Sequence, residues 1–384
     1  MPKYGVIYQY YVHKRLNTLS AMEKCDHITT SSQCGCESDS DAAMGKTFDE
    51  VAQLQRMETA LIPGPEVRAA TPMHQLIPAI EEAYRRYGSE DAQMPAKTYL
   101  ELPEFNGDFR AMPAYLRTDR GPAAGLKWVN VHPDNAESGR YPTVMGVYIY
   151  ADPETGFPLA VMDGTELTMR RTGAAAGVAT DHLASPDAAT FGIVGAGAQA
   201  PAQAEAVTTV RSIEEIVIAD QDADRAATVA AELRDLAATR VGTVEEAVGC
   251  DVCSTITPVR SPIVSRDAVG HDTHINAMGA DAPGKQELDP HLLQDATVII
   301  DDPEQAHHSG EVNVPLTAGQ ITPADIAGTL TAVIEGEVQI PAGRGPTVFD
   351  STGLAIQDVA AAQLVMSEID LAQHTGVDIV GVHA

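Results

Sequence analysis

The stretch Phe191-Gly-Ile-Val-Gly195-Ala-Gly197-Ala-Gln-Ala200 decides the fold of this 384-residue chain. A short apolar run leads into a Gly-x-Gly-x-x-Ala turn, and residues 201–210 behind it have a helical pattern. Gly195 permits the tight turn, Gly197 lets a backbone approach a pyrophosphate, and Ala200 lets helix and strand pack closely. The helix N-terminus then favours an anion. This order of elements predicts a dinucleotide site, although the motif alone also fits a glycine turn without a ligand.

A second apolar run, residues 216–218, ends in Asp220, 25 residues after Gly195. An acid at this place accepts hydrogen bonds from ribose hydroxyls and repels a 2′-phosphate, so we expect NAD as the cofactor. Arg225 lies close in sequence and weakens this preference for NAD over NADP. A solvated acid at the end of a strand remains the alternative reading of Asp220.

The segments that follow continue the alternation of strand and helix. An amphipathic helix is expected at 224–236, and further strands are expected at 251–257, 274–278 and 297–300. Such alternation is typical of a doubly wound parallel sheet. We therefore predict an α/β protein with a Rossmann-type NAD-binding domain at residues 186–344.

The chain upstream has a different rhythm. Apolar residues at helical spacing predict a helix over 76–87 that Gly88 ends. Short apolar runs between turn residues predict antiparallel strands over 98–150. Helices are expected at 165–183 and 353–371, the latter packing back on this region. We predict a second α+β domain for substrate binding and dimerisation, formed by residues 57–185 plus 345–384.

The composition limits the class of partner. The chain has 54 Asp and Glu residues against 25 Lys and Arg, a net charge of −29 spread along its length. Such a surface repels nucleic acid and anionic membranes and fits a protein adapted to strong salt; an acidic partner-binding protein is the alternative. Apolar runs fall short of the roughly 20 residues of a membrane span. Five cysteines, an odd number, favour a reducing cytoplasm.

The first 56 residues differ from the rest. They hold four of the seven lysines, three of the five cysteines and four of the eleven tyrosines. We expect residues 1–56 to be disordered or a non-native extension, with the true start at Met44 or Met57. Cys34 and Cys36 lack a second Cys/His pair nearby, so no metal site is predicted there.

Only three lysines remain beyond residue 47: Lys97, Lys127 and Lys285. An ammonium is a compact cation whose pKa moves readily on burial. Since surface lysines are nearly eliminated, the three that remain suggest a site that binds an anion, most simply a carboxylate.

Polar residues in otherwise apolar segments suggest a substrate site. The cations Lys97, Arg110, Lys127 and Arg171 precede or border the nucleotide domain, and Asp281 is expected to end one of its strands. Ligands of open parallel sheets bind at the carboxyl ends of the strands. We predict that these groups meet between the domains, where cations hold an amino acid's carboxylate and the acid accepts a proton from its amine.

Two other groups of residues are interpreted as structural. Cys250 and Cys253 lie on an expected buried strand and are predicted to be core residues instead of a redox pair. His307 and His308 are predicted to be a loop tip, so no metal is expected.

With these motifs in order, residues 59–384 resemble the family of ornithine cyclodeaminase, archaeal alanine dehydrogenase and mu-crystallin. The stretches that carry the resemblance are Met94-Pro-Ala-Lys97, Phe109-Arg-Ala-Met-Pro113, Leu126-Lys-Trp-Val-Asn130, Pro142-Thr-Val-Met145, Met162-Asp-Gly-Thr165, Arg171-Thr172, Gly195-Ala-Gly-Ala-Gln199, Asn276-Ala-Met-Gly-Ala-Asp-Ala-Pro-Gly-Lys285 and Phe349-Asp-Ser-Thr-Gly353. The resemblance implies a homodimer joined through the non-nucleotide domain.

The resemblance also implies roles for single residues. Lys127 matches the lysine that contacts the substrate carboxylate and assists proton transfer, and Asp281 matches the catalytic aspartate. Lys97 stands where many members have arginine; it and Arg110 and Thr352 are expected to bind substrate. The remaining matches are with positions at the dinucleotide: Thr143, Arg171, Gly195, Gly197, Ala198, Gln199, Asp220, Thr257, Asn276, Gly279, Lys285 and Ser351.

The choice of reaction within the family depends on the side-chain pocket. The cyclodeaminase pattern has glutamate two residues before Met112-Pro113, where this chain has Arg110, a cation that disfavours ornithine's second ammonium. Met162-Asp-Gly-Thr165 also resembles the alanine dehydrogenase branch. We predict NAD-dependent oxidative deamination of a small L-amino acid, most simply L-alanine to pyruvate and ammonia. Conversion of L-ornithine to proline is the alternative, and a ketimine reductase or a non-catalytic NAD-binding protein is a second.

Overall fold

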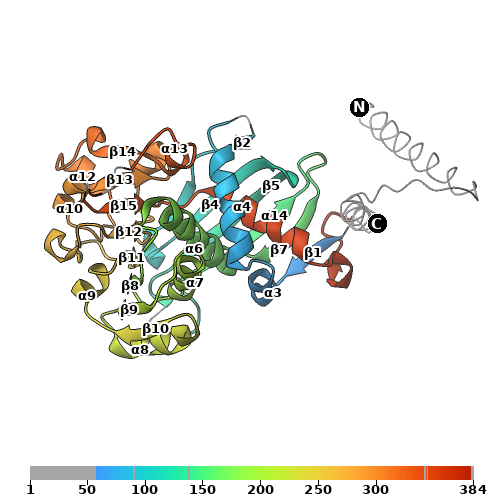
Figure 1. Cartoon of the computed structure of the whole chain (residues 1–384). Coiled ribbons are helices and arrows are strands. Elements are labelled where there is room, and N and C mark those ends of the chain that lie inside the picture. The colour runs from blue at the N-terminus through green and yellow to red at the C-terminus, as the bar shows by residue number, and fades with distance from the viewer. Residues whose placement is uncertain (1–57, 90, 136–138, 341–342, 344, 382–384) are drawn as a thin grey trace, which may run out of the picture. The chain divides into compact units, whose positions relative to one another are not determined.

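The computed structural model describes residues 58–89, 91–135, 139–340, 343 and 345–381. The expectations for residues 1–56 lie outside this part of the chain. The described elements belong to one compact unit, Asp49–Ala384, built on two eight-stranded sheets (Figure 1).

The first sheet confirms the antiparallel region predicted over 98–150. Its order is β16-β1-β7-β6-β5-β4-β2, and β3 also pairs with β4. Between these strands the pairing is antiparallel, apart from β1 with β7. The strands are β1 (Thr59–Ile62), β2 (Ala92–Gln93), β3 (Thr98–Leu102), β4 (Gly107–Thr118), β5 (Gly121–Val131), β6 (Val144–Ala151), β7 (Pro158–Asp163) and β16 (Gly376–Val377).

Helices pack on one face of this sheet. They are α3 (Gly64–Ala69), α4 (Met73–Arg86), α6 (Gly164–Leu183) and α14 (Ala355–Glu368). Helix α4 buries Leu76, Ile80 and Tyr84, one stripe at helical spacing, and it lies beside α14 (Figure 1). Helix α14 packs on β4 and β5. This packing carries residues from the end of the chain into the interior of the first sheet's region.

The second sheet is parallel, as predicted, with the order β10-β9-β8-β11-β12-β15-β13-β14. Its strands are β8 (Thr190–Val194), β9 (Glu215–Ala219), β10 (Ala238–Val241), β11 (Val252–Thr255), β12 (His274–Ala277), β13 (Thr297–Ile300), β14 (Ile326–Thr329) and β15 (Thr347–Asp350). The helices between them are α7 (Ala200–Val210), α8 (Ala223–Glu232), α9 (Val244–Val248), α10 (Pro290–Asp295), α11 (Pro303–Ala306), α12 (Asn313–Thr317) and α13 (Leu330–Ile334).

Several elements differ from the sequence-based expectations. Strand β15 pairs with β12 and β13, so it belongs to the second sheet, although the predicted division gives residues 345–384 to the first domain. The division as a whole stays a prediction. The helix expected over 353–371 begins at Ala355, because Gly353 adopts a positive φ of 77°. Short 3-10 turns are η1 (Pro103–Phe105), η2 (Leu233–Asp235), η3 (Arg266–Ala268), η4 (Pro323–Asp325) and η5 (Leu371–Gln373).

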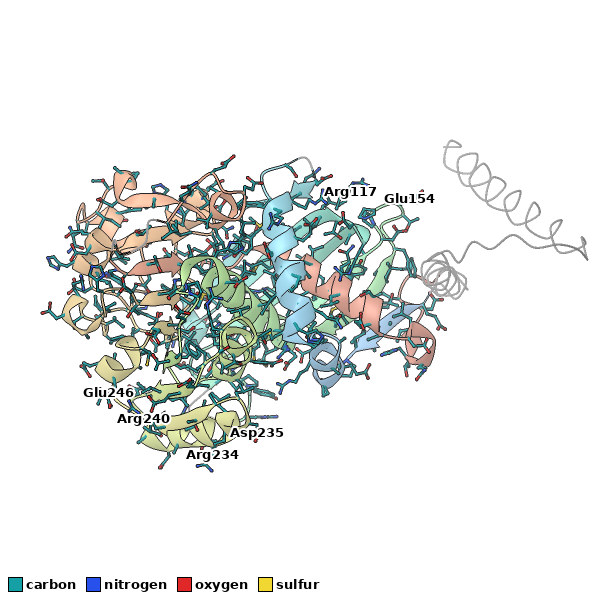
Figure 2. All side chains as sticks on the ribbon, in the orientation of Figure 1. Arg117, Glu154, Arg234, Asp235, Arg240 and Glu246 are labelled. Carbon is teal, nitrogen blue, oxygen red and sulfur yellow. The ribbon has the colours of Figure 1, made fainter. Side chains whose placement is uncertain are left out.

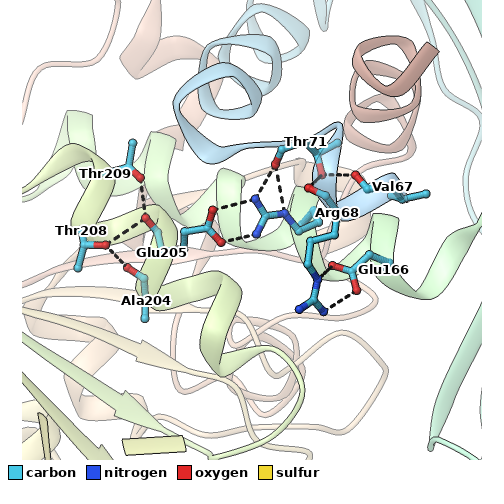
Figure 3. A network of polar contacts seen from close by, with 9 residues as sticks. Val67, Arg68, Thr71, Glu166, Ala204, Glu205, Thr208 and Thr209 are labelled. Atoms are coloured by element: carbon cyan, nitrogen blue, oxygen red, sulfur yellow. Dashed lines mark hydrogen bonds and ion pairs between the residues drawn. The ribbon is translucent and has the colours of Figure 1, made fainter. Parts of the chain in front are cut away.

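Helix α6 runs between the two sheets and is fixed by a polar network (Figure 3). Arg170 Nε donates to the carbonyl of Thr71 at 3.2 Å, and its Nη2 pairs with Glu205 of α7 at 3.0 Å. A Cβ on Gly173 would lie 2.5 Å from the carbonyl oxygen of Ala202. Glycine is therefore required where α6 and α7 meet. Within the described residues, every helix is too short or too polar to cross a membrane.

Candidate active site

The glycine turn lies between β8 and α7, as the sequence predicts. Gly195 has φ 111°, and a Cβ there would lie 3.1 Å from Cγ2 of Thr257, so the turn favours glycine. Gly197 is half-buried and Ala198 is exposed. The Oε1 atom of Gln199 is buried without a hydrogen-bond partner among the described residues. A buried acceptor without a donor fits a site that a ligand completes.

Asp220 follows β9 directly and lies against this turn. Its carboxylate accepts hydrogen bonds from the backbone N–H of Ala196 at 2.6 Å and of Asp222 at 2.9 Å. Arg225 Nη2 donates to the Ala196 carbonyl at 3.2 Å. Asp220 is therefore placed where the sequence predicts, and its contact with a ribose stays a prediction.

Lys127 lies in a buried cluster of charges that we call the cation pocket: Lys127 of β5, Arg171 of α6 and Asp358 of α14. The Lys127 ammonium is 2.9 Å from Oδ2 of Asp358, and Arg171 Nε donates to Oδ1 at 3.0 Å. Arg171 Nη1 also donates to Oε1 of Gln357 at 3.0 Å. The Lys127 and Asp358 side chains are 1% and 0% exposed, so each needs its partner's charge.

The pocket contains two cations and one acid, and this imbalance acts on Lys127. Burial lowers the pKa of Lys127 to about 7; Arg171 lowers it too, and Asp358 opposes the shift. A lysine with such a pKa exchanges a proton readily near neutrality.

Lys97 is half-buried and reaches from the first sheet toward the second. Its ammonium donates to the carbonyl of Thr352 at 2.5 Å. Burial lowers the pKa of Lys97 to about 8, against the raising effect of Asp301 and Asp281. The side chain therefore lies among residues of both sheets.

The predicted meeting of Arg110 with Asp281 is present in the structure. Arg110 Nη1 donates to Oδ2 of Asp281 at 2.9 Å, and Lys285 Nζ donates to Oδ1 at 2.5 Å. Asp108 binds the other side of the Arg110 guanidinium at 2.8 and 3.1 Å. Burial alone would raise the pKa of Asp281, but Lys285 and Arg110 hold it well below its usual range. Asp281 lies four residues beyond β12, in a loop instead of at the strand end.

Two acids of the site were not predicted. Asp358 is one of few polar residues in the apolar helix α14, a pattern that could have indicated it. Asp301, which follows β13, accepts hydrogen bonds from the N–H groups of Thr352 at 2.7 Å and Gly353 at 2.8 Å. It also accepts from the Thr352 hydroxyl at 3.0 Å and from Ser351 Oγ at 3.3 Å. Asp301 thus holds the turn whose carbonyl binds Lys97.

The remaining predicted residues are less closely grouped. Thr143 is half-buried just before β6. Thr257 and Gly279 both donate to Glu287. Asn276 is fully buried and bonded to Thr180 and His274, so the structure does not bring its side chain to the polar cluster.

The structural interpretation of the cysteines agrees with the fold. Cys250 and Cys253 are free, buried thiols. His307 and His308 are exposed in the turn after α11. The described residues contain no group of His, Cys, Asp and Glu that could hold a metal ion.

Comparison with known proteins identifies the family. The model of the ornithine cyclodeaminase/mu-crystallin family matches residues 57–372, so the chain belongs to that family. Alanine dehydrogenase of Archaeoglobus fulgidus is 47% identical over 315 residues, which cover 80% of this chain and 94% of the relative. The predicted family is therefore confirmed.

Solved structures agree with this assignment. An archaeal alanine dehydrogenase dimer with bound NAD matches with a TM-score of 0.79 at 44% identity, covering 84% of this chain and 99% of that one. Thermococcus litoralis Δ1-pyrroline-2-carboxylate reductase, in complex with NADH and L-proline, matches with a TM-score of 0.79 at 31% identity, covering 84% and 100%.

Proposed function

We propose that this family member is an NAD-dependent dehydrogenase that converts a small L-amino acid, most simply L-alanine, to the 2-oxo acid and ammonia. One observation carries the proposal: Arg110 of the first sheet pairs at 2.9 Å with Asp281, which lies in the loop after β12 of the second sheet. The similarity to an archaeal alanine dehydrogenase supports it.

The residues suit the steps of this reaction. Lys97 and Lys127 supply cations for the substrate carboxylate, and Lys127, with a pKa of about 7, holds or releases a proton. Asp281, whose pKa lies well below its usual range, is ionised and accepts a proton from the amine or from attacking water. When bound, NAD would supply the acceptor for the hydride of the α-carbon. Gln199 and the turn at Gly195 would hold the dinucleotide.

The surroundings of Arg110 support a small, neutral side chain. Its guanidinium is held by Asp108 and Asp281 and is 7% exposed. A distal ammonium such as that of ornithine would meet the Arg110 cation there. A second carboxylate on the substrate would compete with Asp108 and Asp281 for the same guanidinium. Arg110 stands where the cyclodeaminase pattern has glutamate, and this favours alanine over ornithine.

An NAD-reduction screen over the amino acids in multimolar salt tests the proposal, with proline formation from L-ornithine assayed in parallel. We expect NADH with L-alanine. Proline from ornithine without net NADH would replace our choice with the cyclodeaminase reaction. Since one solved relative is a pyrroline-2-carboxylate reductase, reduction of that cyclic imine is the third assay.

Lys127→Ala and Asp281→Asn separate a catalyst from a protein that only binds NAD. We expect both variants to lose turnover by about 10²–10⁴-fold, as is usual for an acid–base group, and to keep NAD binding. Rates equal to those of the parent would remove both residues from the mechanism.

We propose NAD over NADP on the charges beside the glycine turn. Asp220, Asp222 and Asp224 lie together after β9, where a 2′-phosphate would meet three acids and one Arg225. Asp220→Ser should raise the preference for NADP, and an unchanged ratio of kcat/KM for the two cofactors would argue against this role.

We propose that the protein is a homodimer joined through the outer face of the first sheet. Leu61 of β1, Val147 of β6 and Trp128 of β5 are 45%, 44% and 39% exposed, and Phe109 stacks on Trp128 with ring centroids 5.1 Å apart. A contiguous apolar face of this kind marks an interface. Val147→Arg should shift sedimentation from dimer to monomer; a parent that sediments as a monomer would end the proposal.

We propose that the enzyme works in the cytoplasm of a cell with high internal salt. The charge of −29 and the free, buried thiols support this. Activity and thermal stability should rise from dilute buffer to multimolar salt, and a protein most stable in dilute buffer would contradict it.

A further inference from the structure

Three buried carboxylates form a series that we call the acid ladder: Glu287, Glu311 and Asp350. Asp350 accepts hydrogen bonds from the backbone N–H of Glu311 at 2.9 Å and of Val312 at 3.1 Å. Glu311 in turn accepts from the backbone N–H of Glu287 at 3.0 Å and of Leu288 at 2.9 Å. Each acid thus fixes the backbone that carries the next one, and Glu287 stands at the end of the series.

Glu287 joins two loops at the carboxyl edge of the second sheet. Its Oε1 accepts from both the backbone N–H and the hydroxyl of Thr257, each at 2.7 Å. Its Oε2 accepts from the backbone N–H of Gly279 at 3.1 Å. Thr257 follows β11 and Gly279 follows β12. One carboxylate therefore ties a predicted cofactor residue to the start of the loop that carries Asp281.

The bond to Gly279 closes that loop at its base. The segment from Gly279 to Glu287 contains both Asp281 and Lys285, which pair at 2.5 Å. The two ends of this segment are held together because the Glu287 side chain accepts a hydrogen bond from the Gly279 backbone N–H. A shift at Glu287 would therefore move Asp281, although Glu287 does not touch it.

The fit around Gly279 leaves little freedom. A Cβ there would lie 2.4 Å from Oε2 of Glu287 and 2.4 Å from the carbonyl oxygen of Thr257. The carboxylate, Gly279 and Thr257 are thus in close contact, and the glycine is required by this approach.

The groups that face Glu287 make its charge costly. The charges of Glu311 and Asp350, the acids of its own series, and of the Cys253 thiol interact with that of Glu287. Burial raises the pKa of Glu287 to about 6, against the donors from Thr257 and Gly279. Protonation converts one carboxylate oxygen to a hydroxyl, which is a weaker acceptor for an N–H.

We propose that Glu287 is a positioning residue that holds the Asp281–Lys285 loop in register with the cofactor-binding residue Thr257. This inference rests on the proposed function of Asp281 and Thr257. Glu287 lies outside the substrate site, but it would fix the position of Asp281 on which proton transfer depends.

Glu287→Gln tests the proposal because the amide keeps one acceptor and gains a donor. Its carbonyl should stay with the two donors of Thr257, which leaves its NH2 facing the N–H of Gly279. We expect kcat with L-alanine to fall about 10²-fold, with NADH affinity within threefold of the parent. Amide hydrogen exchange should accelerate in residues 279–285 and stay unchanged in β11 and β12.

Glu311→Gln is the matched control, since it changes a neighbouring buried acid and keeps an oxygen acceptor for Glu287. It should leave the exchange of residues 279–285 unchanged. Because a like charge is removed, the pKa of Glu287 should fall, and the acid limb of the kcat profile should move to lower pH. In Glu287→Gln the limb that belongs to this acid should be absent.

Two results would overturn the proposal: parental kcat and loop exchange in Glu287→Gln, or a uniform acceleration of exchange matched by Glu311→Gln, which would make Glu287 merely structural. Failure of the proposed function would be seen separately. A parent that lacks turnover with L-alanine refutes that function, whereas the exchange and NADH-binding measurements still test Glu287.

Discussion

The cation pocket and the acid ladder bury charge in opposite ways. In the cation pocket, Lys127 and Arg171 share the carboxylate of Asp358 at 2.9 and 3.0 Å, so side-chain charges of opposite sign stabilise one another. In the acid ladder, Glu311 and Asp350 are held by backbone N–H groups, which are donors without net charge. The first arrangement is balanced by charge and the second by hydrogen bonding alone.

The difference appears in the pKa values. Burial lowers the pKa of Lys127 to about 7 in the cation pocket and raises that of Asp350 to about 7 in the acid ladder. Both regions therefore contain a group that loses a proton as pH rises through neutrality. The consequence differs, because Lys127 becomes neutral and Asp350 becomes charged.

The largest effect should follow from breaking the cation pocket. Lys127→Met removes the proton carrier and leaves Asp358 with Arg171 alone. Turnover should be lost by about 10²-fold or more, and the free energy of unfolding should fall by about 1–2 kcal/mol, because Asp358 loses one donor but keeps Arg171 as its charge partner. Denaturant unfolding without substrate and initial-rate assays measure the two effects.

Lys127→Arg is the control for charge. It should restore most of the stability and little of the turnover, since guanidinium does not release a proton. If Lys127→Met unfolds at the same denaturant concentration as the parent, the pairing with Asp358 contributes no net stability.

A pair of glycines sharpens the comparison. A Cβ on Gly353 would lie 2.8 Å from Nη1 of Arg171 in the cation pocket, and one on Gly279 would lie 2.4 Å from Glu287 in the acid ladder. Gly353→Ala should lower stability by about 1–3 kcal/mol, because its φ is also positive. Gly279→Ala should reduce kcat more than stability, because the atoms it displaces belong to the loop of Asp281. Equal ratios of the two losses in both variants would remove the distinction.

Stability should depend on pH with opposite sign in the two regions. Lys127 has a pKa of about 7 in the folded protein, against an ordinary value of 10.5. Between pH 7 and 10.5 the unfolded chain therefore binds more protons at this residue than the folded protein does. The contribution of Lys127 to the free energy of unfolding rises with pH over this range. Asp350, at about 7 folded against 3.8, contributes stability that falls as pH rises from about 4 to 7. Relative to the parent, Asp350→Asn should gain on the order of 4 kcal/mol across that window. A pH-independent difference between the two proteins would contradict this sign.

The smallest effect should come from an exposed ion pair. Arg240 and Glu246 lie at the surface (Figure 2), 2.9 Å apart and 42% and 47% exposed. In multimolar salt, Arg240→Gln should leave the melting temperature unchanged, because salt screens exposed charges. A clear loss would mean that this surface is ordered by its ion pairs.

The same contrast explains what could be predicted from the sequence. Lys127 and Arg171 of the cation pocket were predicted. Lysines are scarce in this sequence, so a lysine in an apolar segment is conspicuous. The acid ladder was not predicted, since Glu287, Glu311 and Asp350 are three of 54 acidic residues and backbone donors leave no pattern in the sequence. Asp358 was missed for a related reason: its partners lie 231 and 187 residues away.

The fold was predicted further than the site. Hydrophobic periodicity and the glycine turn predicted the parallel second sheet and the antiparallel first sheet, because both depend on local sequence patterns. The place of β15 between β12 and β13 depends on tertiary pairing, and a four-residue strand with only two apolar residues, Val348 and Phe349, does not reveal it.

The position of β15 has a consequence for the synthesis of the protein. Since β15 separates β12 from β13, a nascent chain cannot complete its parallel sheet until residue 350 has left the ribosome, and α14 with Asp358 emerges later still. Completion of the sheet is thus delayed until residue 350 is free to pair, and the unfinished sheet exposes apolar surface until then. A messenger truncated before codon 347 should therefore yield a product that proteases degrade, instead of a smaller stable domain.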